Sequence, residues 1–130
     1  MALVTIPDIR ALVDPLLGAP YARWDCWNLV RFLFHEGFGL DLARDTERAA
    51  VAFQEIWYHE DGTDFQPLVQ PWDLIILTND ASFFISGHVG VAVDQQLFVH
   101  ARDSETGVAL GRLRTWKPYI LQLARYRELL

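Results

Sequence analysis

The chain has 130 residues, of which 52% are hydrophobic and 13% aromatic, so it can fill the core of one folded domain and is not a disordered chain. Its formal net charge of −6 disfavours nucleic acid as a partner, because phosphates require a basic surface. The single cysteine excludes an internal disulfide, and without a Cys-x-x-Cys pair a structural zinc site is not expected.

The start of the sequence lacks the basic residues, apolar run and small-residue cleavage site of a signal peptide. Its apolar runs are also much shorter than a membrane span. We therefore expect one domain over residues 1–130, made in the cytoplasm without a signal peptide and with no membrane span.

Helical spacing dominates the first half of the chain. Residues 7–17 are expected to form a short helix that ends at Gly18. A second helix is expected from Cys26 to Glu36, because Asp25 suits an N-cap and the apolar residues that follow recur on one face. A third helix is expected over residues 46–58, where apolar residues again share a face.

The second half changes to the composition of β-strands. Short apolar segments separated by turn residues predict five strands, over residues 73–78, 88–93, 97–101, 108–113 and 119–126. Strands so close in sequence pair antiparallel. Helices followed by strands predict an α+β domain, with the N-terminal helices packed on one side of a C-terminal antiparallel sheet of about five strands.

The cysteine lies where chemistry is favoured. Cys26 is placed at the first turn of the second helix, where free backbone N–H groups and the helix dipole stabilise a thiolate. His88 and His100 lie on strands joined by a tight turn, so one could act as a base and the other could orient it. His35 is about 13 Å further along the helix of Cys26, and His59 follows the third helix in a polar turn.

Less specific interpretations stay open on spacing alone. A lone buried cysteine is usually a small core residue, and a strand histidine is more often a hydrogen-bonded packing residue than a catalyst. A metal site would require Cys26, His88 and His100 to converge without a close-spaced ligand pair. We therefore expect no metal and no cofactor.

Four segments in order resemble motifs of the NlpC/P60 family of cell-wall cysteine peptidases. Residues 25–30, Asp-Cys-Trp-Asn-Leu-Val, resemble the nucleophile motif Asp-Cys-x-Gly-Leu-Val. Residues 71–75, Pro-Trp-Asp-Leu-Ile, resemble Pro-Gly-Asp-Leu-Val, and residues 88–91, His-Val-Gly-Val, resemble the base motif. Residues 98–101, Phe-Val-His-Ala, resemble the segment that carries the third polar residue, and the resemblance extends over residues 7–126.

The resemblance implies a papain-like fold and a set of roles. Cys26 would be the nucleophile, His88 the base and His100 the residue that orients it. Asp25 would help to hold the free amine of the peptide, and Tyr21 would match an active-site tyrosine that helps to meet the oxyanion.

Trp27 stands where the family often has serine, next to the nucleophile, and is expected to bind substrate. Two other positions depart from the family, since Asn28 and Trp72 both stand where it has glycine. The sequence Asp-Cys-Trp resembles the subset of the family encoded with phage tails.

The function implied is a peptidoglycan endopeptidase of a phage or phage-like tail. It would cleave a stem-peptide amide, with the D-γ-glutamyl–diamino acid bond as the family's typical target, while associated with a virion or tail particle at the bacterial cell wall. Expected partners are the peptidoglycan stem peptide and other tail-tip proteins. Two alternatives remain: a catalytically silent or latent structural tail-tip protein, and a cysteine amidase or acyltransferase.

Overall fold

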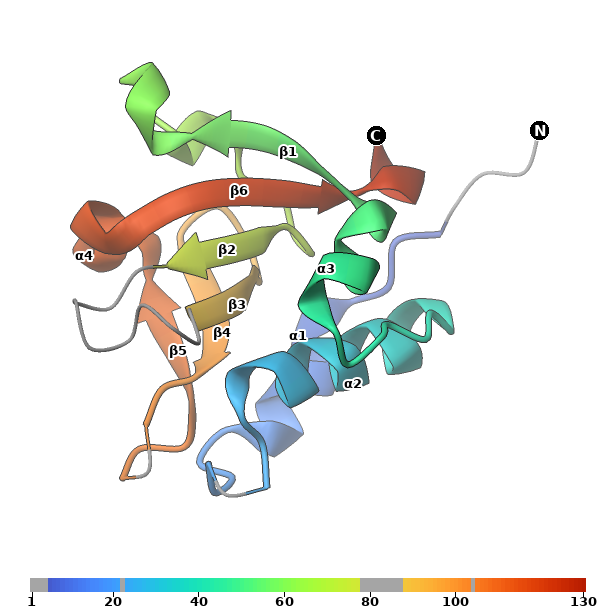
Figure 1. Cartoon of the computed structure of the whole chain (residues 1–130). Helices are drawn as coiled ribbons and strands as arrows, with labels where there is room; N and C mark the ends of the chain where they lie inside the picture. The colour runs from blue at the N-terminus through green and yellow to red at the C-terminus, as the bar shows by residue number, and fades with distance from the viewer. Residues whose placement is uncertain (1–4, 22, 78–87, 104) are drawn as a thin grey trace.

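The computed structural model describes residues 5–21, 23–77, 88–103 and 105–130 as an α+β fold (Figure 1). Its helices are α1 (Ile9–Val13), α2 (Cys26–Phe38), α3 (Thr46–Ala49) and α4 (Leu113–Trp116). The strands are β1 (Phe53–Tyr58), β2 (Leu74–Leu77), β3 (His88–Ala92), β4 (Leu97–Ala101), β5 (Val108–Arg112) and β6 (Ile120–Tyr126). None of the described helices is long and apolar enough to cross a membrane.

One antiparallel sheet contains all six of these strands, in the order β1-β6-β2-β3-β4-β5. The last strand of the chain therefore lies between β1 and β2, while the strands from β2 to β5 follow one another as a meander. The α+β prediction is confirmed, with one strand more than the five expected.

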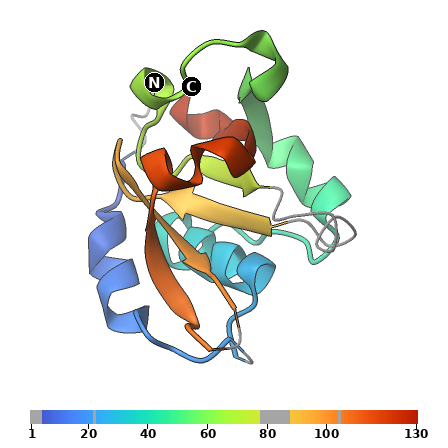
Figure 2. The same cartoon turned by 90° about the vertical axis from the view of Figure 1, so that its left-hand side faces the viewer.

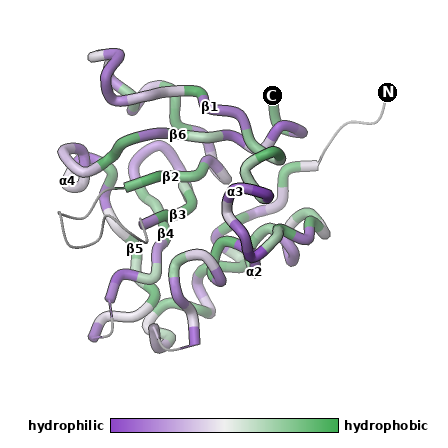
Figure 3. The backbone as a smooth tube through the Cα atoms, in the orientation of Figure 1, coloured by the Kyte–Doolittle hydropathy of each residue, from purple (hydrophilic) through white to green (hydrophobic). Residues whose placement is uncertain are grey.

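The sheet has a hydrophobic cluster on each face, because neighbouring residues of a strand point to opposite sides. Leu74 joins the cluster beneath α1 and α2, whereas Ile75 joins the one on the other face, which the segment around Phe65 and the residue Leu113 cover. The helices α1 and α2 lie together on one side of the sheet in both views (Figures 1 and 2). Hydrophobic colour concentrates in central strands such as β2, with hydrophilic segments at the outer turns (Figure 3).

The prediction of a helix over residues 46–58 is wrong in its second half. The helix α3 ends at Ala49, a 3₁₀ turn follows, and residues 53–58 form β1 at the edge of the sheet. A bulge shifts the register between Glu55 and Trp57, so Phe53 and Trp57 are buried in opposite clusters. Buried residues four positions apart imitate the spacing of a helix face, which explains the error.

The helix α2 extends two residues beyond the predicted end at Glu36. Gly37 lies inside it, and the indole of Trp72 fills the space where a side chain would be, since a Cβ there would be 2.6 Å from the ring. Gly39 ends the helix in the left-handed conformation, with φ of 67°.

Candidate active site

Asp25 caps the helix that carries the cysteine. Its Oδ1 accepts a hydrogen bond from the Asn28 backbone N–H at 2.8 Å, and its Oδ2 accepts one from the Asn28 side-chain amide at 3.2 Å. Asp25 and Asn28 are both exposed, so the asparagine that replaces the family's glycine meets no steric obstacle. This cap fixes Cys26 at the first position of α2.

The thiol of Cys26 faces the beginning of β3. Burial raises the pKa of the thiol, a hydrogen bond from the Val89 backbone N–H opposes that increase, and the nearby Asp25 carboxylate adds to it. The backbone amides of Trp27 and of Cys26 itself also favour the charged sulfur. The contact with Val89 places the sulfur beside the residue that follows His88.

His88 and His100 form a hydrogen-bonded pair across β3 and β4. The Nε2 atom of His88 is 2.7 Å from Nδ1 of His100, and the two side chains are 7% and 1% exposed. Burial lowers the pKa of His88 to about 4, and burial together with the neighbouring His88 lowers that of His100 to about 3. Both imidazoles are therefore neutral at pH 7.

The resting site is a neutral thiol near a neutral imidazole. The structure records no hydrogen bond from the Cys26 sulfur to either imidazole among the residues it describes. His88 uses Nε2 for His100, so its Nδ1 is the nitrogen left to take a proton. The arrangement suits a base that acts during attack rather than a pre-formed ion pair.

The other predicted site residues lie around the thiol. Tyr21 is half-buried, and its pKa is raised by burial first and then by the proximity of Cys26 and Asp25. The indole of Trp27 donates a hydrogen bond to the Ala43 carbonyl at 3.0 Å and stands at the border of a cavity. His35, in contrast, is exposed and 3.6 Å from Asp41, and His59 is exposed on a 3₁₀ turn.

The cavity beside His88 has a volume of about 290 Å³. Four adjacent strands form its floor, and α3 and Trp27 form its walls. It is lined by Trp27, Thr46, Ala50, Phe53, Glu55, Leu74, Ile76, His88, Val89, Gln122 and Ala124. Sequence reasoning missed Thr46 and Glu55 here, because the prediction of one long helix hid the strand that carries Glu55.

Trp72 stands where the Pro-Gly-Asp-Leu-Val motif of the family has glycine, and its backbone has a conformation that suits glycine. Its φ is +77°, and it is the only non-glycine residue with a positive φ in the described part of the chain. Its side chain is completely buried against Phe34 and Phe38, and its indole N–H donates to the Pro7 carbonyl at 2.9 Å. The ring fills the core beneath α2 and does not enter the cavity beside His88.

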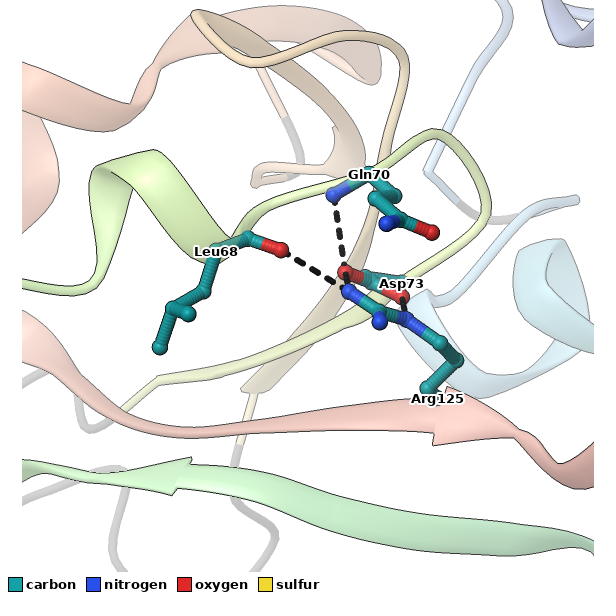
Figure 4. Close-up of polar contacts among 4 residues, drawn as sticks. All are labelled: Leu68, Gln70, Asp73 and Arg125. Atoms are coloured by element: carbon teal, nitrogen blue, oxygen red, sulfur yellow. Dashed lines mark hydrogen bonds and ion pairs between the residues drawn. The ribbon is translucent and has the colours of Figure 1, made fainter. Parts of the chain in front are cut away.

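A buried ion pair holds the strands that form the cavity floor. Asp73, which precedes β2, is fully buried and receives two hydrogen bonds from Arg125 of β6, both of 2.8 Å. Arg125 also donates to the Leu68 carbonyl, and Asp73 accepts from the Gln70 backbone N–H (Figure 4). The pair connects β6 to β2, and among the described residues no buried side-chain polar atom lacks a hydrogen-bond partner.

A metal centre finds no support in the described part of the chain. No group of three or more His, Cys, Asp or Glu side chains there is placed to hold an ion. His88 and His100 instead form a hydrogen bond with each other.

A cysteine at the start of a helix, facing a strand that begins with one histidine of a buried pair, is typical of the papain-like α+β class. Residues 16–125 match the NlpC/P60 family, and the chain belongs to that family.

The chain is similar to the tail tip assembly protein K of Escherichia phage N15, with 22% identity over 124 residues. That match covers 88% of the chain but 50% of the phage protein, so the chain spans about half the length of this relative.

Solved structures share the fold. NlpC2 from Trichomonas vaginalis superimposes with a TM-score of 0.69 at 22% identity, over 95% of this chain and 48% of that one. The NlpC/p60 domain of the peptidoglycan hydrolase SagA gives 0.65 at 18% identity, over 91% and 95%. A lipoprotein-like NLP/P60 protein from Staphylococcus aureus gives 0.65 at 24% identity, over 92% and 40%.

Proposed function

We propose that residues 1–130 form a catalytic domain that hydrolyses a stem-peptide amide of peptidoglycan, as part of a phage or phage-like tail. The observation that carries this proposal is the placement of the Cys26 thiol at the Val89 amide, one residue from a histidine that is itself bonded to His100. Membership of the NlpC/P60 family and the similarity to a tail tip protein support the substrate and the location.

The proposed reaction uses Cys26, His88 and His100 in two steps. The Cys26 sulfur attacks the amide carbonyl carbon while Nδ1 of His88 takes the thiol proton. This requires the His88 tautomer that carries its proton on Nε2 and donates it to Nδ1 of His100. His88 then gives the proton to the leaving amine, and a water molecule activated by His88 hydrolyses the thioester and restores the thiol.

The start of α2 provides hydrogen-bond donors for the oxyanion. The backbone amides of Cys26 and Trp27 face the sulfur, and the Tyr21 hydroxyl lies close enough for the charge of Cys26 to raise its pKa. Removing one such donor costs roughly 100- to 1,000-fold in rate in enzymes of this type. Asp25 caps α2 with both carboxylate oxygens but stays exposed to solvent, and we propose that it attracts the amine of the peptide. We also propose the D-γ-glutamyl–diamino acid amide as the bond cleaved.

The second candidate function is a structural tail-tip protein without activity, which the relative's role in tail tip assembly favours. Two features count against it. Trp72 turns into the core rather than blocking the site, and a cavity stays open beside His88.

Digestion of purified peptidoglycan, read by mass spectrometry, separates the two. The unmodified chain should release stem-peptide fragments, and Cys26→Ala and His88→Gln should release none. His35→Gln is the matched control, because this exposed histidine is part of α2 but lies away from the thiol, and it should retain full activity. Intact peptidoglycan after incubation with folded protein would reject the enzyme and leave the structural role.

A further inference from the structure

The cavity beside His88 is apolar except at a few points. Its floor is formed by aliphatic side chains of β2 and β3, together with Phe53 and Ala124. Of the described residues that line it, Glu55 is the one acidic side chain, and the other ionisable side chain is His88, whose pKa burial lowers to about 4. Glu55 takes part in none of the ion pairs recorded among the described residues.

The bulge in β1 accounts for the direction of Glu55. Before the bulge, Phe53 and Glu55 both line the cavity on the α2 side of the sheet. After it, Trp57 is buried on the opposite side. The bulge therefore confines the strand's contribution to this cavity to one aromatic residue and one carboxylate.

Two arginines from the end of β6 and the turn after it, next to β1, are bound elsewhere. Arg125 is bonded to Asp73 and the Leu68 carbonyl, and Arg127 donates to the Val51 carbonyl and the Gln54 side chain. The Glu55 carboxylate is thus available to a positive group that enters the cavity. A long aliphatic chain with an amine at its end matches apolar walls and a single anion.

We propose that this cavity binds the amine-bearing side chain of the residue on the leaving-group side of the scissile amide, with Glu55 as its specificity-determining residue. The inference rests on the proposed function for the position of the bond. His88 must protonate the leaving amine, so the leaving residue lies next to His88, and the cavity is bordered by His88 and Val89. In a stem peptide this residue is a diamino acid, whose second amine would meet Glu55.

Two peptides that differ by one acetyl group test the pocket: alanyl-γ-D-glutamyl-lysyl-alanine, and the same peptide acetylated on the lysine side-chain amine. Calorimetry with Cys26→Ala measures binding without turnover, and kcat/KM is measured with the cysteine present. We expect the free amine to be favoured about tenfold in both assays, as for a partly solvated charged hydrogen bond. Glu55→Gln should abolish this preference by weakening only the free-amine peptide.

Glu47→Gln is the matched control, because it removes the same charge from α3 at a residue that does not line the cavity, and it should keep the tenfold preference. Equal affinity of Cys26→Ala for the two peptides, undetectable binding of both, or a preference that survives Glu55→Gln would overturn the pocket. Preferential binding without hydrolysis would support the pocket and reject the proposed function. Hydrolysis of both peptides at equal rates would support the proposed function and reject the pocket.

Discussion

Replacing Trp72 with glycine, the residue that the family motif has at this position, should destabilise the protein even though the backbone there is of the glycine type. The indole is completely buried, contacts Phe34 and Phe38 with ring centroids 5.2 and 4.8 Å away, and fills the space above Gly37. Truncating a buried tryptophan costs about 3–5 kcal/mol, and the lost hydrogen bond to Pro7 costs about 1 kcal/mol more.

Relief of the left-handed backbone opposes this loss. A non-glycine residue at φ of +77° costs on the order of 1–2 kcal/mol, which glycine would recover. The free energy of unfolding of Trp72→Gly should therefore fall by about 3 kcal/mol. In urea this corresponds to a decrease of the midpoint by about 1–2 M, for a slope typical of a domain of this size.

The matched control measures the backbone cost alone. Gly39 has φ of +67° and nothing within 4 Å of the position a Cβ would take, so Gly39→Ala should cost only about 1 kcal/mol. Urea titrations followed by tryptophan fluorescence and by circular dichroism should agree for all three proteins. If Trp72→Gly matches or exceeds the unmodified protein in stability, the burial argument for this position is refuted.

Three further predictions follow from the buried groups. The free energy of unfolding should fall as pH falls from 6.5 toward 4, because the unfolded chain binds protons at its histidines before the folded one does. His88 alone contributes about 3 kcal/mol to this decrease. Urea titrations that give a constant free energy of unfolding over this pH range would contradict the prediction. Alkylation of Cys26 by iodoacetamide should be slow at pH 7 and rise with a midpoint above that of an unperturbed cysteine, because burial raises the pKa of the thiol. A midpoint below that of an unperturbed cysteine would indicate an ion pair with His88 instead. Asp73→Asn should lower the free energy of unfolding by about 3 kcal/mol in thermal or urea unfolding, because Arg125 loses its counter-charge, and an unchanged midpoint would show that the pair contributes nothing.

Local signals in the sequence were sufficient for the parts of the fold that local physics decides. The cap at Asp25, the face of α2 and the four strands of the meander follow from side-chain chemistry and spacing within a few residues. The nearness of His88 and His100 followed from one tight turn, which joins β3 to β4.

What the sequence did not reveal depends on distant partners. The strand β1 pairs with β6, about seventy residues later in the chain, and its bulge gave it the burial pattern of a helix. The cavity combines residues from four strands and two helical segments, so Glu55 had no local signal that would mark it. The left-handed backbone of Trp72 could be expected only from the family resemblance, because tryptophan itself disfavours it.

The position of β6 has a consequence for how the protein is made. Among the described strands, β1 has β6 as its single neighbour, so β1 is synthesised well before the strand that gives it hydrogen-bonded partners. Until residue 126 has emerged, the nascent chain has exposed strand edges and an unfinished cavity floor. The cavity floor is therefore completed only when β6 pairs with β1 and β2, after the other described strands have been made.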